Sequence, residues 1–273
     1  KDEMTSPQST QPQSKIIPLS ETPKLLSPTG ILGLGGMTLY RRPVAFVREL
    51  LRHANSNSYA LTLLAFTAGY ESDLLVGAGL IKRVRSCYFG LEAFGLAPMF
   101  TQAANLGEIE IIEETEASLA FGIRATLADV GFMAGRGWLG TDLPKLRPDV
   151  KTVTDPYNGE TLMAYPAIAC DVAVIHALKA DHAGNALIGG NQGVDVELAM
   201  IARTTIVTAE EIVEKLDRAD IPGPAVHAVA HARRGAWPTS CHPLYPLGCG
   251  EILNYIDACN SEQFDEYVRR LQS

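Results

Sequence analysis

The sequence predicts an open α/β domain in which a largely parallel sheet is flanked by helices. Two features of the chain indicate this fold. Short apolar runs, glycine-bearing turns and amphipathic segments follow one another repeatedly in the first half, and such recurrence is typical of strand–helix units in a parallel sheet. The second half adds further apolar runs of strand length and ends in two helical segments.

The clearest of these units lies at residues 30–54. An apolar run at 31–34 is followed by a turn that is rich in glycine, with Gly33, Gly35 and Gly36. A helix is expected from Pro43 onward, because proline is favoured in a first helical turn and apolar residues then recur at helical spacing. The stretch therefore predicts a strand, a tight turn and a helix.

The glycine turn allows two interpretations. Glycine suits a backbone with positive φ or the close approach of a ligand, and free N–H groups at Gly35 and Gly36 could bind a phosphate or a developing oxyanion. The spacing is not a dinucleotide-binding fingerprint, because the third glycine would fall at Thr38. A binding loop and a plain tight turn both stay open.

The remaining elements follow from the same patterns. A short helical turn is expected at 21–26. Further strands are expected at 60–66, 84–89, 109–112, 172–177, 204–208 and 225–230. Further helices are expected at 72–77, 115–129, 195–202, 252–259 and 261–271. Thr115 is the expected N-cap of the helix that it begins.

The middle of the chain departs from this pattern. Residues 131–148 are expected to be a loop because glycine and proline recur there. Two short strands at 150–154 and 161–165 flank Pro156-Tyr157-Asn158-Gly159, which is a hairpin turn signal. Residues 235–246 are expected to form a second loop.

Composition limits the classes of function. The chain has 273 residues, 47% of them hydrophobic, a formal net charge of −8 and a pI near 5.3. This length and hydrophobic content provide an ample core. The acidic balance argues against nucleic-acid or anionic-membrane binding. No apolar run approaches membrane-spanning length.

The five cysteines form no CxxC pair and are odd in number, which favours free thiols and a cytoplasmic location. Cys241, His242 and Cys249 do not match a zinc-ligand spacing, so no metal is expected. Residues 1–15 are polar and should be a disordered tail. Lys1-Asp2-Glu3 before Met4 looks like a cloning remnant, and one domain should span 16–273.

Several patches occur in a fixed order after about Leu19, and together they carry a resemblance. They are Gly33-Leu34-Gly35-Gly36-Met37 with the helix start that follows, Asp73-Leu74-Leu75-Val76-Gly77-Ala78-Gly79, Asp171-Val172-Ala173-Val174-Ile175-His176-Ala177, Ala183-Gly184-Asn185, Thr205-Ile206-Val207-Thr208-Ala209-Glu210-Glu211-Ile212, Asp220-Ile221-Pro222-Gly223 and Gly235-Ala236-Trp237-Pro238-Thr239-Ser240-Cys241. Their order resembles the α subunit of a family I coenzyme A transferase of the glutaconate CoA-transferase type.

The resemblance implies a Rossmann-like open sheet and pairing with a β subunit, in a heterodimer that assembles to a heterotetramer or larger. It implies an acyl-CoA:carboxylate CoA-transferase in which a β-subunit glutamate attacks the thioester, with coenzyme A as substrate and no other cofactor. The matching strand end here, at 65–69, holds no carboxylate. This chain is therefore expected to form one wall of the acyl pocket and not to supply the nucleophile.

The expected substrate- or CoA-binding residues lie in the turns after the first two strands: Gly35, Gly36, Thr38, Arg41, Arg42, Thr67, Ala68 and Gly69. Arg41 and Arg42 could bind a carboxylate or a phosphate, or they could be an exposed helix start. His176 is expected to be a satisfied buried histidine, because it follows an apolar strand.

Glu92 is the candidate catalytic residue of this chain. It lies between Gly90 and Gly95, near a predicted strand end, and an apolar setting would raise its pKa and suit acid/base work. A surface or interface glutamate is the alternative. Two further functions stay open: a CoA-thioester hydrolase of the ring-opening type or an acyl-CoA decarboxylase on the same scaffold, and a non-catalytic acyl-CoA-binding subunit.

Overall fold

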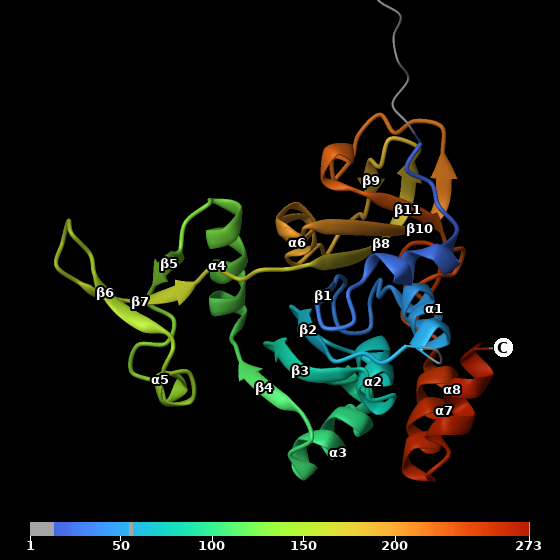
Figure 1. Ribbon diagram of the computed structural model, residues 1–273, viewed down its shortest axis with the longest axis horizontal. Coiled ribbons are helices and arrows are strands. Elements are labelled where there is room, and N and C mark those ends of the chain that lie inside the picture. The colour runs from blue at the N-terminus through green and yellow to red at the C-terminus, as the bar shows by residue number, and fades with distance from the viewer. Residues whose placement is uncertain (1–13, 55–56, 273) are drawn as a thin grey trace, which may run out of the picture.

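A twisted parallel sheet forms the centre of the molecule (Figure 1). The computed structural model describes residues 14–54 and 57–272. The strands run in the order β11-β10-β8-β1-β2-β3-β4 and pair in parallel throughout, and β9 adds an antiparallel pair to β8. Their bounds are β1 Ile31–Leu34, β2 Leu61–Ala65, β3 Ile81–Ser86, β4 Glu110–Glu113, β8 Val172–Asp181, β9 Ala186–Leu187, β10 Thr204–Val213 and β11 Ala228–His231.

The direction of winding reverses at β1. From β1 the chain proceeds through β2, β3 and β4 toward one edge, whereas β8, β10 and β11 fill the other side. Open α/β sheets bind ligands outside the carboxyl ends of the strands at such a reversal. The turn after β1, with Gly35 and Gly36, lies at this point.

Alternating side chains pack into two cores, because successive residues of a strand point to opposite faces. On one face, Leu32, Leu34 and Leu63 pack with helices that include α1 Val44–Ala54, α2 Tyr70–Gly77, α7 Cys249–Asn260 and α8 Phe264–Gln272. On the other face, Ala173 and Ile175 pack with α4 Glu116–Leu127 and α6 Asp195–Ile201. Both faces of the central strands are thus buried, as is typical of parallel sheets, whereas β4 at the edge is mostly exposed.

A small antiparallel sheet forms an arm beside the main sheet (Figure 1). Its strands are β5 Phe132–Gly135, β6 Lys151–Thr154 and β7 Thr161–Pro166, in the order β5-β7-β6, with α5 Leu143–Leu146 beside them. It has its own core of Trp138, Val150, Met163 and Tyr165. The arm therefore packs around side chains that the main sheet does not use.

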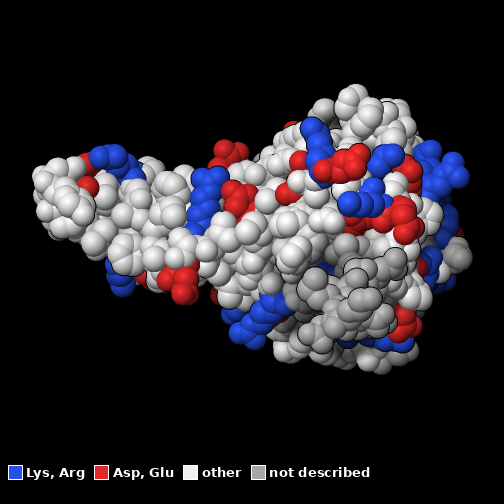
Figure 2. Space-filling model, turned by 90° about the horizontal axis from the view of Figure 1, so that it is seen from above, with Lys and Arg blue, Asp and Glu red and all other residues white. Residues whose placement is uncertain are grey.

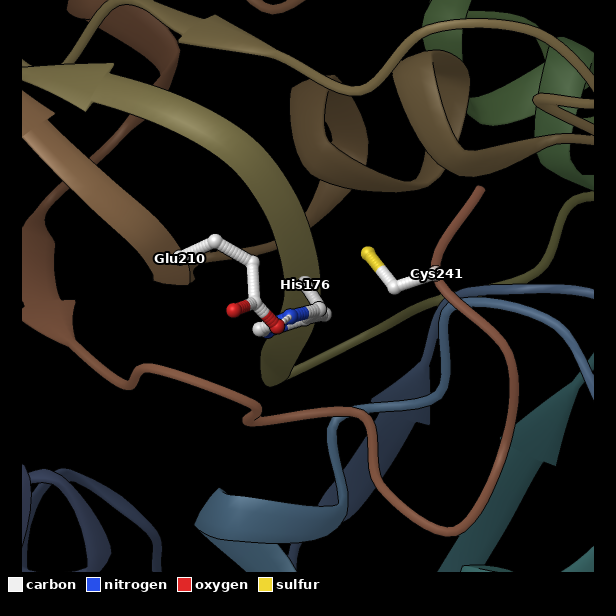
Figure 3. A group of neighbouring side chains, drawn as sticks. All are labelled: His176, Glu210 and Cys241. Atoms are coloured by element: carbon white, nitrogen blue, oxygen red, sulfur yellow. Dashed lines mark hydrogen bonds and ion pairs between the residues drawn. The ribbon is translucent and has the colours of Figure 1, made fainter. Parts of the chain in front are cut away.

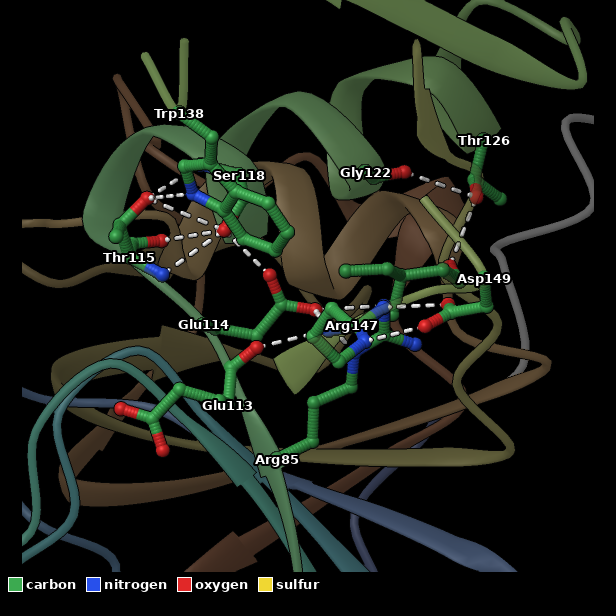
Figure 4. A network of polar contacts seen from close by, with 11 residues as sticks. Arg85, Glu113, Glu114, Thr115, Ser118, Gly122, Thr126, Trp138, Arg147 and Asp149 are labelled. Carbon is green, nitrogen blue, oxygen red and sulfur yellow. Dashed lines mark hydrogen bonds and ion pairs between the residues drawn. The ribbon is translucent and has the colours of Figure 1, made fainter. Parts of the chain in front are cut away.

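An ion-pair network joins the arm to the main sheet (Figure 4). Glu114, just after β4, contacts Arg85 of β3 and Arg147 at the end of the arm's helix, each at 2.7 Å. Arg147 also pairs with Asp149 at 2.8 Å, and this hydrogen bond holds the pKa of the Asp149 carboxyl below its usual value. The network fixes the root of the arm to the edge of the sheet.

Most elements expected from the sequence are confirmed, including β1, α1, the β6–β7 hairpin and the cap of α4 by Thr115, which accepts a hydrogen bond from the Ser118 amide. The helical turn near 21–26 is the 3-10 helix η1, Leu19–Leu25. The strand expected at 84–89 is shifted, because β3 begins at Ile81 and the aromatic residues that suggested its end lie in the loop after it.

Several short elements were not expected. One is the helix α3, Pro98–Leu106, which has no fully buried residue and packs against the core with the partly buried Met99, Phe100, Ala103 and Ala104. β5 and α5 lie within 131–148, which was expected to be a loop, and each has only four residues. Residues 1–13 of the expected tail lie outside the described residues, but Lys15 is ordered: its ammonium group donates to the carbonyl oxygens of Gly223 and Val226.

The surface carries both signs of charge. Figure 2 shows basic and acidic side chains interspersed over the main body and the arm. Within the described residues, the helices are all too short or too polar to cross a membrane.

Candidate active-site edge

The turn after β1 is a compact structure whose glycine amides are already bonded. Gly36 has φ +87°, and a Cβ atom there would lie 2.6 Å from the Arg41 carbonyl oxygen, so glycine is required. The Gly35 amide donates to the Val174 carbonyl oxygen at 3.0 Å, and the Gly36 amide donates to the Asp195 carboxylate. The expectation of free N–H donors at Gly35 and Gly36 is therefore wrong.

Arg41 lies beneath this turn and is fully buried. Its guanidinium contacts Asp195 at 2.7 Å and donates to the His176 carbonyl oxygen at 2.8 Å. The same Asp195 carboxylate accepts the Gly36 amide, so the ion pair links α6, β8 and the glycine turn. Because its charge is buried and paired, Arg41 has no exposed group for a ligand.

Arg42 is buried in the same way but on the other side of the turn. Its Nε donates to Glu71 at 2.9 Å, and Nη1 donates to the carbonyl oxygens of Gly36 at 2.8 Å and Thr67 at 2.7 Å. Arg42 thus joins the turn after β1 to the turn after β2. The expectation that Arg41 and Arg42 bind a substrate anion is wrong, and so is the alternative of an exposed helix start.

The second turn packs directly against the first. The Thr67 side-chain oxygen accepts the Thr38 amide at 2.9 Å, and a Cβ atom at Gly69 would lie 2.2 Å from the Thr38 carbonyl oxygen. Thr67, Ala68 and Gly69 are buried, whereas Thr38 is partly exposed. Of the predicted binding residues, Thr38 is the one whose side chain reaches the surface.

The loop after β3 completes this edge. The Ala68 amide donates to the Tyr88 carbonyl oxygen at 2.8 Å, and the Gly90 amide donates to the Ala68 carbonyl oxygen at 3.2 Å. Glu92 follows at the start of the 3-10 helix η2, Glu92–Phe94, with an exposed side chain. The apolar setting expected to surround Glu92 is absent from the described part of this chain.

Part of the backbone strain in the described residues lies at these turns. Thr38, Arg41 and Glu92 have φ values of 42°, 54° and 54°. Residues other than glycine rarely adopt this left-handed backbone conformation. Those that do cluster at active sites and ligand clamps, where the surrounding structure holds them. The strain therefore marks two of the loops that the sequence indicated, those after β1 and β3.

The exposed face of this edge is partly apolar. Met37, Phe66 and Phe89 are partly exposed and Tyr88 is exposed. The Thr67 hydroxyl lies 3.8 Å from the Met37 sulfur, and the Glu92 amide donates to the Tyr88 hydroxyl at 3.3 Å. The face thus combines apolar area, one hydroxyl from Thr38 and one carboxylate from Glu92.

A buried cluster behind the first turn escaped the sequence analysis (Figure 3). His176 of β8 contacts Thr208 and Glu210 of β10, each at 2.9 Å, and Cys241 lies nearby on the loop after β11. Tyr245 donates to the same Glu210 oxygen. His176 is buried with both ring nitrogens bonded, so that expectation is confirmed.

The cluster fixes the protonation state of its members. Burial lowers the pKa of His176, and although burial alone would raise the pKa of Glu210, its bonds from His176 and Tyr245 lower it below the usual value. Glu210 is therefore an ionised acceptor, so His176 donates from Nε2 and accepts from Thr208 at Nδ1. Burial raises the pKa of Cys241 to about 11, which keeps the thiol protonated.

The ligand atoms of His176, Glu210 and Cys241 lie within 4.8 Å of one another, which is close enough to consider a metal ion. However, the Glu210 carboxylate already accepts the amides of Arg234 and Gly235, at 2.6 and 3.0 Å, in addition to its side-chain partners. A metal would have to displace this network. The arrangement fits a structural support of the loop at 235–246 better than a coordination site.

The comparisons with known proteins agree with this geometry. Residues 24–232 match the sequence profile of the family described as Coenzyme A transferase. The chain is 35% identical over 210 residues to one of the subunits of 3-oxoadipate CoA-transferase from Pseudomonas knackmussii, covering 74% of this chain and 73% of that relative. It is 32% identical over 251 residues to the cholesterol ring-cleaving hydrolase IpdA subunit of Mycobacterium tuberculosis, covering 85% and 83%.

Two solved structures share the fold. The decarboxylase AibA/AibB C56S variant superposes with a TM-score of 0.88 and 27% identity, over 96% of this chain and 99% of that chain. Glutaconate coenzyme A-transferase from Acidaminococcus fermentans superposes with a TM-score of 0.86 and 28% identity, over 94% and 88%. The profile match and these identities together show that the chain belongs to the coenzyme A transferase family.

Proposed function

We propose that this chain is the α subunit of a heteromeric acyl-CoA:carboxylate CoA-transferase and that it shapes one wall of the acyl-CoA site. The observation that carries the proposal is the convergence of three loops, after β1, β2 and β3, at the carboxyl edge where the sheet reverses, with strained backbone in the first and the third. Their exposed face is partly apolar and open. A second subunit would close it into a cavity.

The nucleophile is expected on that β subunit. The strand end at 65–69 reads Ala-Phe-Thr-Ala-Gly, so it holds no carboxylate to attack a thioester. In the proposed cycle a β-subunit glutamate attacks the acyl-CoA carbonyl carbon, the C–S bond breaks and a mixed anhydride forms. The released thiolate then attacks the glutamyl carbonyl, which frees the acid and gives a glutamyl-CoA thioester.

This chain would position the acyl group and stabilise the oxyanion. The amides in the first turn of a helix have no intrahelical partner, and α2 starts beside this edge, after Gly69, which has no side chain to cap it. The Thr38 hydroxyl is a further donor. Fixed donors of this kind act on the charge that develops in the tetrahedral intermediate.

Glu92 favours a second candidate function, a CoA-thioester hydrolase or an acyl-CoA decarboxylase. Its carboxylate is exposed on the proposed wall and its backbone is held at φ 54°. The similarity to the IpdA hydrolase chain and to a decarboxylase structure points to the same chemistries. In that case Glu92 would act as an acid or base on the bound acyl group.

Substitution of Glu92 by Gln in the complex with the β subunit tests this role. Loss of general acid–base catalysis lowers kcat by about 10²-fold or more, whereas a wall residue would change kcat by only a few-fold. Glu108→Gln is the control, because Glu108 is also exposed but lies beyond α3. Full activity of the Glu92→Gln complex would exclude a catalytic role for Glu92.

We further propose that the complex is a heterotetramer or larger and that it is cytoplasmic. The five cysteines are free in the structure, which fits a reducing compartment. The relatives support the heteromer, since their names are those of subunits.

A further inference from the structure

Asp73 occupies a buried position that joins the helices behind the active-site edge. It lies on α2, and its side chain is fully buried. Oδ1 accepts the Phe100 amide at 2.6 Å, and Oδ2 accepts the Met99 amide at 3.2 Å and the Tyr255 hydroxyl at 2.6 Å. Three elements, α2, α3 and α7, thus meet at one carboxylate.

Two of these bonds cap α3. Pro98 is the first residue of α3, so the amides of Met99 and Phe100 belong to its first turn and have no intrahelical partner. The residue before the helix, Ala97, has no side chain that can cap them. A carboxylate at a helix N-terminus also interacts favourably with the helix dipole. Asp73 therefore supplies from another helix the cap that the local sequence lacks.

One contact between aromatic rings connects the capped start of α3 to the loop that holds Glu92. The Phe100 ring stacks on Phe89 with 4.1 Å between centroids and 7° between planes. Phe89 lies in the loop after β3 and forms a parallel bridge with Ala68, which lies in the turn after β2. Glu92 follows Phe89 three residues later in the same loop. The contacts run without a gap from Asp73 through Phe100 and Phe89 to the loop at 87–95.

The third hydrogen bond of Asp73, from the Tyr255 hydroxyl, connects it to the C-terminal helices. Tyr255 of α7 packs edge-on against Tyr70 at 5.0 Å between centroids, and the Tyr70 and Tyr267 hydroxyls are 2.7 Å apart. Tyr267 of α8 also donates to Glu251 of α7 at 2.7 Å. The helices α7 and α8 are thus bound to α2 at the same place as the cap of α3.

We infer that Asp73 is a positioning residue: by capping α3 it holds the loop at 87–95, and with it Glu92, in the orientation that the reaction needs. The kinetic part of this inference rests on the proposed function of Glu92. Burial raises the pKa of the Asp73 carboxyl to about 6, so above that pH the group is ionised and accepts all three bonds.

The Asp73→Asn variant of the complex with the β subunit is the test. An amide keeps the size of the carboxyl group but turns one acceptor into a donor, which opposes an amide of the first turn of α3. We expect amide hydrogen exchange at 87–95 to accelerate about tenfold. We expect kcat to fall about tenfold while KM changes less than about twofold, as a misplaced catalytic group produces.

Two further variants are the controls. Asp181→Asn alters another buried carboxylate that accepts backbone amides, at the end of β8, on the opposite side of β1 from β3, so it should lower stability without changing exchange at 87–95 or kcat. Tyr255→Phe removes one bond to Asp73 but keeps both amide bonds, so its effect on the loop should be smaller and in the same direction. It also replaces Asp73→Asn as the test if that variant does not assemble.

The rate of amide hydrogen exchange at 87–95 tests whether Asp73 supports the loop, independently of catalysis. Exchange rates in Asp73→Asn equal to those of wild type would overturn the inference. If Asp73→Asn does not assemble, wild-type exchange rates in Tyr255→Phe would overturn it. A loss of kcat in Asp181→Asn equal to that in Asp73→Asn would also overturn it. If Glu92→Gln is fully active, the proposed role of Glu92 fails, but faster exchange in Asp73→Asn would still establish Asp73 as the support of the loop.

Discussion

Arg42 shows how individual residues build the active-site edge. It is a buried cation that bonds Glu71 and the carbonyl oxygens of two different turns. Glu71 relies on Oε1 for this pair and for the Ser72 hydroxyl at 2.6 Å, because its Oε2 has no partner in the described structure. A buried ion pair of this kind orients its surroundings, and removal of one partner leaves an uncompensated charge.

Glu71→Gln should therefore lower the free energy of unfolding by about 3–5 kcal/mol. The reason is that Arg42 would stay buried without its counter-charge. Urea denaturation measures the loss. Glu211→Gln is the matched control, since Glu211 pairs with Lys179 at 2.8 Å on the surface, with side chains 55% and 43% exposed, and should change stability by less than about 1 kcal/mol. Equal effects of the two substitutions would contradict the structural role of Glu71.

His176 predicts a pH dependence of stability. Because burial lowers its pKa in the folded state, the unfolded chain binds more protons below its ordinary pKa of about 6.5. The contribution of neutral His176 is thus present above about pH 6.5 and is lost as the pH falls further. His176→Gln, which cannot titrate, should show a shallower loss of stability between about pH 6.5 and 5 than wild type.

Denaturation midpoints at the two pH values measure this difference. Asp73, whose pKa is raised to about 6, contributes with the opposite sign, since its protonation on acidification relieves a buried charge. Its contribution is common to wild type and His176→Gln and cancels in the comparison. Parallel pH profiles would show that His176 does not carry the effect.

At the scale of elements, the turn after β1 depends on its backbone conformation. Gly36→Ala would place a Cβ atom 2.6 Å from the Arg41 carbonyl oxygen at φ +87°. We expect a loss of about 2 kcal/mol or more, because the strain and the contact with backbone cannot both be relieved. Gly250→Ala in α7 is the control: a Cβ atom there meets nothing within 4 Å, so stability should stay the same or rise by up to about 1 kcal/mol.

Chemical denaturation of both glycine variants gives the comparison. A stable Gly36→Ala variant would mean that the turn can rearrange, and the rigid wall inferred here would then be wrong.

Local patterns explain which elements the sequence predicts. β1, α1 and the hairpin carry their signals within a few residues, as an apolar run, a proline and a Pro-Tyr-Asn-Gly turn. The cap of α3 carries no such local signal, because it is supplied by Asp73, 26 and 27 residues earlier in the chain. Elements that depend on distant partners cannot be read from their own residues.

The same distinction applies to the site. The sequence predicts binding loops at Gly36, Gly69 and Glu92, which stays a prediction. It also assigned Arg41 and Arg42 to a ligand, but both are buried in ion pairs. The partner of Arg41 is Asp195, 154 residues away, and the partner of Arg42 is Glu71, 29 residues away. Nothing adjacent to the arginines reveals these pairs. The link between His176 and Glu210 likewise depends on the register of β8 with β10.

At the scale of the whole molecule, the proposed wall of the acyl-CoA site is open on its outer side. The loops at the carboxyl edge are fixed from behind by Arg41, Arg42 and Asp73, yet their outer face, with Thr38 and Glu92, is open. The arm extends away from the sheet on its own small core (Figures 1 and 2). A rigid but open wall is what a subunit needs when another chain supplies the nucleophile.

The most direct measurement is mass spectrometry of the purified complex after incubation with acyl-CoA and borohydride or hydroxylamine trapping. The account predicts a modification on a glutamate of the β subunit, none on this chain, and no turnover by this chain alone. A trapped intermediate on this chain, or full turnover by the isolated chain, would contradict the account.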